Sequence, residues 1–194
     1  MKLKTSITII GGCLIIFIFI MLPLFLSIGD KKEKYIASIT GSSFSLTDIN
    51  NNLVTEKSFQ VSNAALFFGF THCPDVCPTT LNKLSILLEE LKKDKKTLKV
   101  FFISIDPERD TPEVMRNYLS SFEGKFTGIT GKPEKIFKLS QSWGIASQKI
   151  FSENGEYTVN HSSPIILLKD GKYVDRISHK DDLKRSIKII KKYL

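Results

Sequence analysis

An uncharged, mostly apolar stretch near the N-terminus sets the first constraint on this chain. No Asp, Glu, Lys or Arg occurs from Thr5 to Gly29, and residues 7–28 are almost continuously apolar. A helix needs about 20 apolar residues to cross the hydrocarbon core of a bilayer, whereas the apolar part of a secretory signal peptide has only ~7–15 residues. The stretch therefore predicts a transmembrane helix over residues 1–29 that stays on the protein. Cleavage after the small residues near position 29 is the alternative.

Charge does not settle the orientation of this predicted anchor. Lysines stand on both sides of it, at positions 2 and 4 and at positions 31, 32 and 34, so the Lys/Arg count that orients membrane helices is nearly balanced. Cys13 lies inside the apolar stretch and is interpreted as a small apolar residue of the anchor. The side of the membrane on which the rest of the chain lies must therefore be inferred from its chemistry.

The remainder of the chain has the composition of one folded domain. Residues 30–40 begin with a charged segment and are interpreted as a linker, and residues 41–194 are long enough to bury a single sizeable core. A hydrophobic content of 42% excludes global disorder, and 3 cysteines are too few for a disulfide scaffold.

The basic net charge of +8 does not point to nucleic acid. The lysines are spread along the chain, whereas a nucleic-acid-binding domain gathers its basic residues into a patch. Only residues 92–96 and 184–192 are densely basic, and we interpret both as solvated helix faces. We expect no nucleic-acid partner.

Buried strands alternate with amphipathic helices along residues 41–194. The expected strands cover residues 42–46, 53–55, 64–70, 98–105, 126–130, 145–151, 157–159, 165–169 and 172–177. The expected helices cover residues 79–91, 111–122, 132–143 and 181–193. Turn residues predict β-hairpins around Asn50–Asn52, Asn154-Gly155 and Asp170-Gly171. This order predicts an α/β fold, with a mixed sheet flanked by helices.

Two cysteines follow the apolar strand at 64–70, where the next helix begins. Cys73 and Cys77 form a Cys-x-x-x-Cys motif, one residue wider than the motif of familiar thiol–disulfide oxidoreductases. Unpaired N–H groups and the partial positive charge at a helix N-terminus favour thiolate over thiol, so we expect lowered cysteine pKa values. On a helix, positions i and i+4 place their Cβ atoms about 5–6 Å apart, wider than the ~3.8 Å of a disulfide. The pair can still oxidise, but its spacing favours a metal ion held between the two sulfurs.

A metal site needs a further ligand, and the chain has 3 histidines. His161 precedes the strand at 165–169, and in a thioredoxin-like fold the loop before that strand packs beside the start of the cysteine-bearing helix. We therefore expect His161 to complete a site with Cys73 and Cys77. Two thiolates and one imidazole suit copper, above all Cu(I), and can also hold Cu(II). Structural zinc takes four protein ligands, and no fourth is evident.

Other interpretations of these residues stay open. Cys73 and Cys77 can form a structural disulfide, remain inert buried thiols, or act in redox chemistry without a metal. His161 can be an ordinary loop or core histidine. His72 is a weaker candidate ligand because neighbouring residues rarely point the same way, and His179 is expected in an exposed loop.

Three blocks of residues give the chain a resemblance to a known family. They are GFTHCPDVCP at 69–78, SIDPERDTP at 104–112 and VNHS at 159–162, in this order behind an N-terminal apolar stretch. With these blocks, residues 40–194 resemble the SCO/SenC family, the membrane-anchored copper chaperones of cytochrome c oxidase assembly.

The resemblance implies a thioredoxin-like fold with an added N-terminal β-hairpin, and copper ligands at Cys73, Cys77 and His161. It implies delivery of copper to the CuA centre of oxidase subunit II, or reduction of the cysteines of that subunit. The protein is then a metallochaperone rather than an enzyme, with a membrane-tethered thiol–disulfide reductase as the alternative. Weaker alternatives are a peroxiredoxin-like peroxidase acting through Cys73 and an anchored interaction domain with an incidental cysteine pair.

Two further residues are interpreted through the resemblance. Asp106 lies in a family landmark and is interpreted as part of a structural loop beside the site, with a role in copper transfer or partner contact as the alternative. Asn160 stands where the family commonly has Asp before its histidine. This departure removes a charge near the metal but no ligand.

The resemblance also implies a location, because copper reaches CuA outside the cytoplasm. No Arg-rich, acid-poor transit peptide precedes the apolar stretch. We therefore expect a single-pass protein of a bacterial inner membrane whose C-terminal domain faces the periplasm, or the mitochondrial intermembrane space if the protein is organellar.

Overall fold

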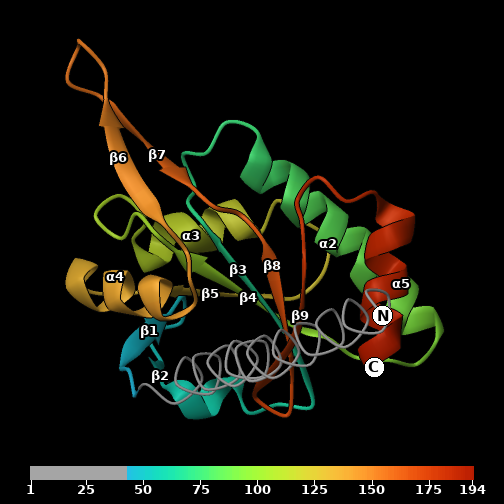
Figure 1. The fold of residues 1–194 in the computed structure, drawn as a ribbon. Coiled ribbons are helices and arrows are strands. Elements are labelled where there is room, and N and C mark those ends of the chain that lie inside the picture. The colour runs from blue at the N-terminus through green and yellow to red at the C-terminus, as the bar shows by residue number, and fades with distance from the viewer. Residues whose placement is uncertain (1–42) are drawn as a thin grey trace, which may run out of the picture. The chain divides into compact units, whose positions relative to one another are not determined.

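A seven-stranded mixed sheet with strand order β2-β1-β5-β4-β3-β8-β9 forms the centre of the structure (Figure 1). The chain divides into two units, Met1–Ile39 and Thr40–Leu194, and the computed structural model describes residues 43–194, which belong to the second. The predicted anchor, the predicted linker and Cys13 lie outside the described residues. Within residues 43–194, no helix is long and apolar enough to cross a membrane.

The elements alternate along the chain much as the sequence patterns predict. The strands are β1 (Leu46–Asp48), β2 (Leu53–Val54), β3 (Asn63–Gly69), β4 (Lys99–Ser104), β5 (Phe126–Thr130), β6 (Ser147–Phe151), β7 (Tyr157–His161), β8 (Ile165–Lys169) and β9 (Lys172–Ile177). The helices are α2 (Val76–Lys93), α3 (Pro112–Leu119), α4 (Pro133–Ser142) and α5 (Leu183–Tyr193), and a 3-10 turn η1 (Glu56–Phe59) follows β2.

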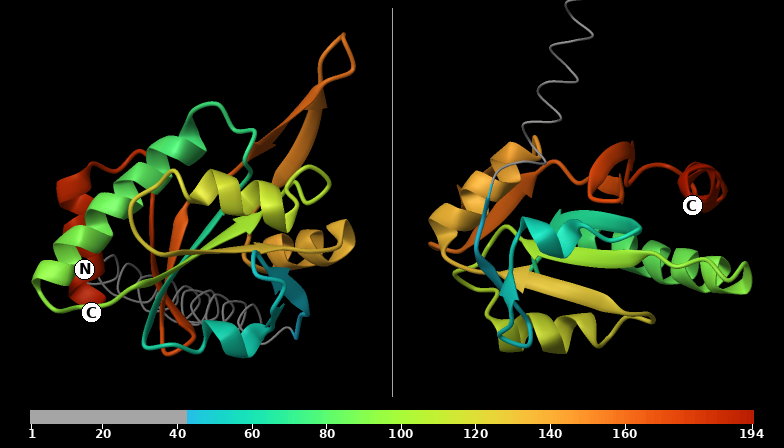
Figure 2. Two further views of the ribbon diagram at one scale, coloured as in Figure 1. Left: turned by 180° about the vertical axis from the view of Figure 1, so that it is seen from behind. Right: turned by 90° about the horizontal axis from the view of Figure 1, so that it is seen from below.

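The centre of the sheet is covered on both faces. β3, β4 and β5 run parallel, and β8 runs antiparallel to β3. Every residue of β3 from Ala64 to Gly69 is buried, as expected for a strand with structure packed on both sides. Helices α3 and α4 lie on opposite sides of β5 (Figure 2). The predicted α/β class with a mixed sheet flanked by helices is confirmed.

The predicted N-terminal hairpin is present, but its first strand is short and begins later than expected. β1 pairs antiparallel with β2 and extends the sheet beside β5. The carboxylate of Asp48 accepts hydrogen bonds from the backbone N–H groups of Asn50 and Asn52, each at 2.8 Å. This local side-chain turn ends the strand at Asp48.

Helix α2 begins at Val76, three residues before the predicted start. Cys77 and Pro78 therefore lie in its first turn. Proline is tolerated there because the N–H that it lacks has no partner within the helix at that point. The prediction of the next helix start was more accurate, since the Thr111 hydroxyl accepts the N–H of Val114 at 3.3 Å and Pro112 is the first helical residue.

The hairpin of β6 and β7 is separate from the main sheet. The two strands pair only with each other, and the hairpin projects beyond the rest of the domain (Figure 1). Strand β7 continues to His161, two residues past its predicted end. His161 is therefore the last residue of a strand, whereas the sequence placed it in the loop before β8.

Candidate metal centre

The two cysteines lie where β3 passes into α2. Both are free thiols, Cys73 half-buried and Cys77 fully buried. The backbone N–H of Cys77 donates to Sγ of Cys73 at 3.4 Å, and the backbone N–H of Cys73 donates to the carbonyl oxygen of Phe70 at 3.3 Å. These contacts hold the sulfur of Cys73 at the N-terminal end of α2.

The two thiols differ sharply in acidity. The pKa of Cys73 falls from the ordinary value of 9.0 to about 4, chiefly because the Cys77 thiol donates a hydrogen bond to its sulfur. The His161 side chain and the backbone N–H groups of Asp75 and Cys77 lower this pKa further, against the opposing effect of burial. The pKa of Cys77 is raised, first by its interaction with Cys73 and then by burial. At neutral pH the pair is therefore one thiolate and one thiol.

Gly69, the last residue of β3, leaves the space that the Cys77 sulfur occupies. A Cβ atom at position 69 would lie 2.8 Å from Sγ of Cys77 and 2.8 Å from the ring of Phe102. Any larger residue would push the sulfur or the ring away. The glycine thus permits the close approach of the strand to the first turn of α2.

The main sheet brings His161 to this loop. At the start of β8, Ile165 lies opposite Phe67 of β3, and the two strands are antiparallel. The segment before β8 and the segment after β3 therefore leave the sheet at the same end of these strands. The His161 ring contacts the ring of Phe70 edge-on, with centroids 5.8 Å apart. Together with its effect on the pKa of Cys73, this contact places the imidazole beside the cysteine loop.

The orientation of the His161 ring leaves one nitrogen for a metal. Nδ1 lies 2.9 Å from the carbonyl oxygen of Ser162, and a carbonyl can only accept a hydrogen bond. A proton on Nδ1 would satisfy this carbonyl and leave Nε2 as the nitrogen able to bind a metal. The hydroxyl of Ser163 lies 3.2 Å from Nδ1 and 3.4 Å from Nε2, so a metal at Nε2 would replace any hydrogen bond made there.

Cys73, Cys77 and His161 are neighbours, but they do not form a complete metal-binding site as they stand. Among residues 43–194, no three His, Cys, Asp or Glu side chains are grouped closely enough to hold a metal ion as they stand. The donors have suitable chemistry, with a thiolate, a thiol and an imidazole. Coordination by all three would require the His161 ring or the sulfurs to move.

His72 points toward a different group. Its Nδ1 lies 3.1 Å from the hydroxyl of Thr71 and 3.9 Å from a carboxylate oxygen of the buried Asp110. His179 lies in the predicted loop between β9 and α5, but it is half-buried rather than exposed, and its carbonyl accepts a hydrogen bond from Lys83 at 2.8 Å.

Sequence reasoning missed the role of Asp110. Its carboxylate accepts hydrogen bonds from the Thr71 hydroxyl at 2.6 Å and the Ser104 hydroxyl at 2.7 Å, and burial raises its pKa. It thereby anchors the segment two residues before Cys73. The only signal in the sequence was its place in the block at 104–112.

A second polar cluster ties β7 to the segment after β4. The Tyr157 hydroxyl donates to the Asp106 carboxylate at 2.8 Å, and Arg109 Nε donates to the other oxygen of that carboxylate at 2.5 Å. Arg109 also donates from Nη1 to the Tyr157 carbonyl oxygen at 2.9 Å. Asp106 itself is fully buried.

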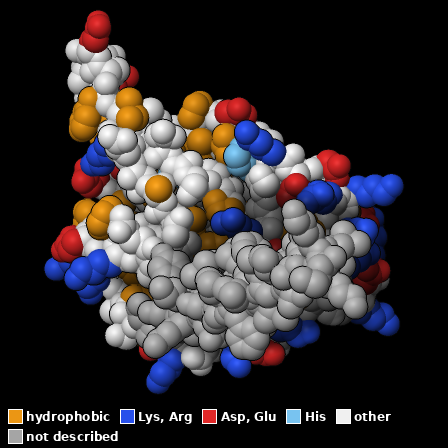
Figure 3. All heavy atoms as spheres, in the orientation of Figure 1, with side chains coloured by type: hydrophobic (Ala, Val, Ile, Leu, Met, Phe, Trp, Pro, Cys, Tyr) orange, Lys and Arg blue, Asp and Glu red, His pale blue; other side chains and the backbone are white. Residues whose placement is uncertain are grey.

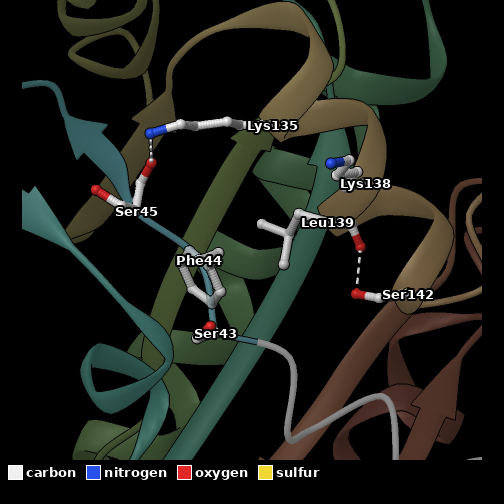
Figure 4. Close-up of a pocket in the computed structure, with 7 residues that line it drawn as sticks. All are labelled: Ser43, Phe44, Ser45, Lys135, Lys138, Leu139 and Ser142. Carbon is white, nitrogen blue, oxygen red and sulfur yellow. Dashed lines mark hydrogen bonds between the residues drawn. The ribbon is translucent and has the colours of Figure 1, made fainter.

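A surface pocket elsewhere has no metal-binding chemistry. It lies between residues 43–45 and α4, and its lining includes Lys135, Lys138 and Leu139 (Figure 4). No cysteine, histidine or carboxylate lines it. The cysteine loop therefore remains the candidate site.

Comparison with known proteins places the chain among relatives that share most of its length. The family model for SCO1/SenC matches residues 32–194. A SCO2-like protein of Rickettsia prowazekii is 35% identical over 137 residues, which are 69% of this chain and 67% of that protein. The mitochondrial protein SCO2 of Saccharomyces cerevisiae is 31% identical over 169 residues, 85% of this chain but only 56% of the yeast protein.

The fold agrees with these matches. The structure of ScoI from Bradyrhizobium japonicum with copper bound is similar at a TM-score of 0.71 and 41% identity, covering 79% of this chain and 99% of that one. The chain has the thioredoxin-like fold of these proteins, and on the family match together with this identity it belongs to the SCO1/SenC family.

Proposed function

We propose that this protein is a copper chaperone that binds one copper ion through Cys73, Cys77 and His161 and delivers it to the CuA centre of cytochrome c oxidase subunit II during assembly. Copper is the cargo of this activity. Support comes from family membership, from the copper bound to the Bradyrhizobium relative, and from the donor set.

The observation that carries the proposal is an asymmetric thiol pair beside an imidazole. Thiolate and imidazole donors suit copper, and two sulfurs favour Cu(I). Cys73 already offers a thiolate because its pKa is about 4, whereas Cys77 must lose its proton when the metal binds. Copper binding should therefore release a proton from Cys77 at neutral pH.

The unequal burial of the two sulfurs suits transfer. Cys77 is fully buried while Cys73 is partly exposed, so a copper ion between them would be approached from the Cys73 side. Three protein ligands leave room for a ligand of the acceptor to join before the chaperone ligands leave. A buried site with four protein ligands would hold its metal more permanently.

A second candidate function rests on the same asymmetry. A half-exposed thiolate beside a buried thiol is the arrangement that thiol–disulfide exchange uses. The Cys73 thiolate would attack a disulfide of the target, forming a mixed disulfide, and Cys77 would then lose its proton and displace the target sulfur. The target would gain two thiols, and the protein would gain the Cys73–Cys77 disulfide.

The proposal includes a membrane location. Residues 1–29 would anchor the protein in a bacterial inner membrane, or in the mitochondrial inner membrane if the protein is organellar. Residues 30–40 would link the anchor to the copper-binding domain at 41–194, which would face the periplasm or the intermembrane space. Protease protection in sealed spheroplasts and inverted vesicles tests this orientation.

The test of function uses the full chain, purified in detergent and reduced without oxygen. We expect one copper ion per protein, and X-ray absorption should report two sulfur ligands and one nitrogen ligand. His161→Ala should weaken copper binding sharply, with His179→Ala as the matched control. Undiminished affinity in His161→Ala would remove His161 from the site.

The same variant separates the two candidate functions. A reductase needs Cys73 and Cys77 but not His161. If His161→Ala loses copper but still reduces an oxidised peptide carrying the CuA-site cysteines at the full rate, that activity is independent of copper. If the unaltered protein does not reduce the peptide at all, the second candidate is excluded.

A further inference from the structure

The β6–β7 hairpin carries His161 but lacks the support of the main sheet. It pairs with no other strand, and an isolated two-stranded hairpin is only marginally stable. A hollow of about 190 Å³, lined by residues of β6, β7, α4 and the segment after β4, separates part of the hairpin from the domain. Specific contacts must therefore set the angle at which the hairpin stands (Figure 1).

The face of β7 that carries His161 also carries Tyr157. Alternate residues of a strand point to the same side, and Tyr157, Val159 and His161 are less exposed than the residues between them. Val159 packs into the core. A rotation of the strand that moves Tyr157 would therefore also move the His161 ring.

Tyr157 contacts Asp106 and Arg109 in three ways, and its ring also lies 4.4 Å from Lys149 Nζ and 5.6 Å from the ring of Phe151, both measured to the Tyr157 centroid. Its hydroxyl donates to Asp106 at 2.8 Å, its carbonyl accepts from Arg109 at 2.9 Å, and the Arg109 guanidinium lies over its ring at 3.8 Å from the centroid. Arg109 also pairs with Asp106 at 2.5 Å. The three side chains thus form a cluster at one end of β7.

The same cluster is tied to the cysteine side of the site. The backbone N–H of Ile105, next to Asp106, donates to the Gly69 carbonyl at the end of β3 at 2.9 Å. Asp106 is therefore fixed next to the end of β3, where the cysteine loop begins. Through Asp106 and Arg109, the cluster connects this end of the sheet to β7, the strand that carries His161.

Lys149 on β6 adds a weaker contact from the other strand of the hairpin. It pairs with Glu108 at 2.6 Å, where both side chains are partly exposed, and its Nζ lies 4.4 Å from the centroid of the Tyr157 ring. Exposed pairs contribute little because water and salt screen them.

The hairpin itself presents exposed apolar side chains, Ile150 and Phe151, and hydrophobic atoms gather along it in the surface view (Figure 3).

We propose that Asp106, Arg109 and Tyr157 are positioning residues for copper, which hold β7 at the angle that brings His161 within reach of Cys73. This inference rests on the proposed function and deepens it. None of the three residues touches the metal. They act through the placement of the His161 ring.

Tyr157→Phe is the sharpest test, because it removes one hydroxyl and keeps the ring. In the full chain, we expect copper affinity to fall about tenfold, since hydrogen bonds to charged groups are the stronger ones. X-ray absorption should show less nitrogen coordination at unchanged sulfur coordination. In the metal-free protein, the substitution should raise the rate of hydrogen exchange at β7 and leave the rate at β3 unchanged.

A control and a double variant separate positioning from general folding. Thr158→Ala, on the exposed side of the same strand, should leave copper affinity and the nitrogen signal unchanged. In the His161→Ala background, Tyr157→Phe should have no further effect on copper affinity, because the residue through which it acts is gone.

The outcomes distinguish this inference from the proposed function. If unaltered protein binds copper through His161 while Tyr157→Phe keeps the affinity and the exchange rate at β7, the positioning role is wrong and the chaperone function stands. A tenfold loss that persists in the His161→Ala background also overturns it. Failure of the unaltered protein to bind copper overturns both.

Discussion

The imidazole of His161 rests edge-on against the ring of Phe70, with the two centroids 5.8 Å apart and the ring planes at 71°. Phe70 is almost completely buried and follows directly after β3. The contact therefore joins a rigid part of the core to the histidine at the end of the projecting hairpin. It is the direct structural link between the two distant segments of the candidate site.

Phe70→Leu should weaken copper binding without unfolding the protein. Leucine keeps most of the buried volume, but it loses the aromatic contact, which is worth about 0.5–1.5 kcal/mol. We expect copper affinity to fall by about three- to tenfold, measured by competition with a chromophoric Cu(I) chelator. Phe67→Leu, in β3 and away from the imidazole, is the control. An equal loss of affinity there would mean that the contact with His161 is not the cause.

Gly69→Ala should disrupt the site by displacing the buried sulfur of Cys77. The added methyl group would meet the Cys77 sulfur and the Phe102 ring at 2.8 Å, and overpacking of this kind costs about 1–3 kcal/mol. We expect lower thermal stability together with much weaker copper binding.

Gly131→Ala is the matched control for that substitution. Its methyl group would meet the Leu46 side chain at 2.6 Å, in the N-terminal hairpin. Thermal stability should fall, while the folded protein should keep its copper affinity. If both variants bind copper equally well, the space at Gly69 is irrelevant to the metal.

Alkylation of the metal-free protein should reveal the unequal thiols. A thiolate is the reactive form, and protonation below its pKa removes it. Because the pKa of Cys73 is about 4, its reaction with iodoacetamide should change little between about pH 5 and pH 8, whereas an ordinary thiol slows nearly tenfold per pH unit over that range. Cys77, whose pKa is raised, should stay unmodified, as peptide mapping by mass spectrometry can show.

Cys77→Ala adds a direct test of the cause. Its side chain is the largest contributor to the lowered pKa of Cys73. Without that donor, the pKa of Cys73 should rise, and alkylation at about pH 5 should slow. A pH profile identical to that of the unaltered protein would show that other groups stabilise the thiolate.

His72→Ala should leave copper binding unchanged. Although His72 is adjacent to Cys73 in sequence, its ring faces Thr71 and Asp110. The metal should therefore keep its full affinity and its nitrogen ligand in X-ray absorption, in contrast to His161→Ala. Loss of the nitrogen signal in His72→Ala would make His72 the ligand in place of His161.

Much of the fold follows from local patterns. Continuous apolar runs identified β3 and β4, and Asp170-Gly171 identified the turn between β8 and β9. The threonine–proline pair at 111–112 marked the start of α3 because its hydroxyl and its fixed backbone angle act within one turn. Such signals are readable because their causes lie within a few residues.

The length of β7 was less predictable. A hydrophobic pattern could not extend the strand past Val159, because the next residue, Asn160, is polar and exposed. Pairing with β6, where His161 lies opposite Ser147, supplies the backbone hydrogen bonds that a pattern of side chains does not report. The early start of α2 was missed for a similar reason. Its first turn contains Pro78 and has no apolar residues at helical spacing, so the side-chain pattern did not indicate a helix there.

By itself, the amino-acid sequence determined which chemistry is available: two cysteines at a helix start, a histidine before a buried strand, and the alternation of strands and helices that builds the sheet. The tertiary structure decided which of these groups meet and in which protonation state. The pKa of Cys73, the contact of His161 with Phe70 and the cluster around Tyr157 all depend on contacts between residues far apart in the chain. Electrostatic effects and hydrogen bonds act across distances of a few ångströms, and only the folded chain sets those distances.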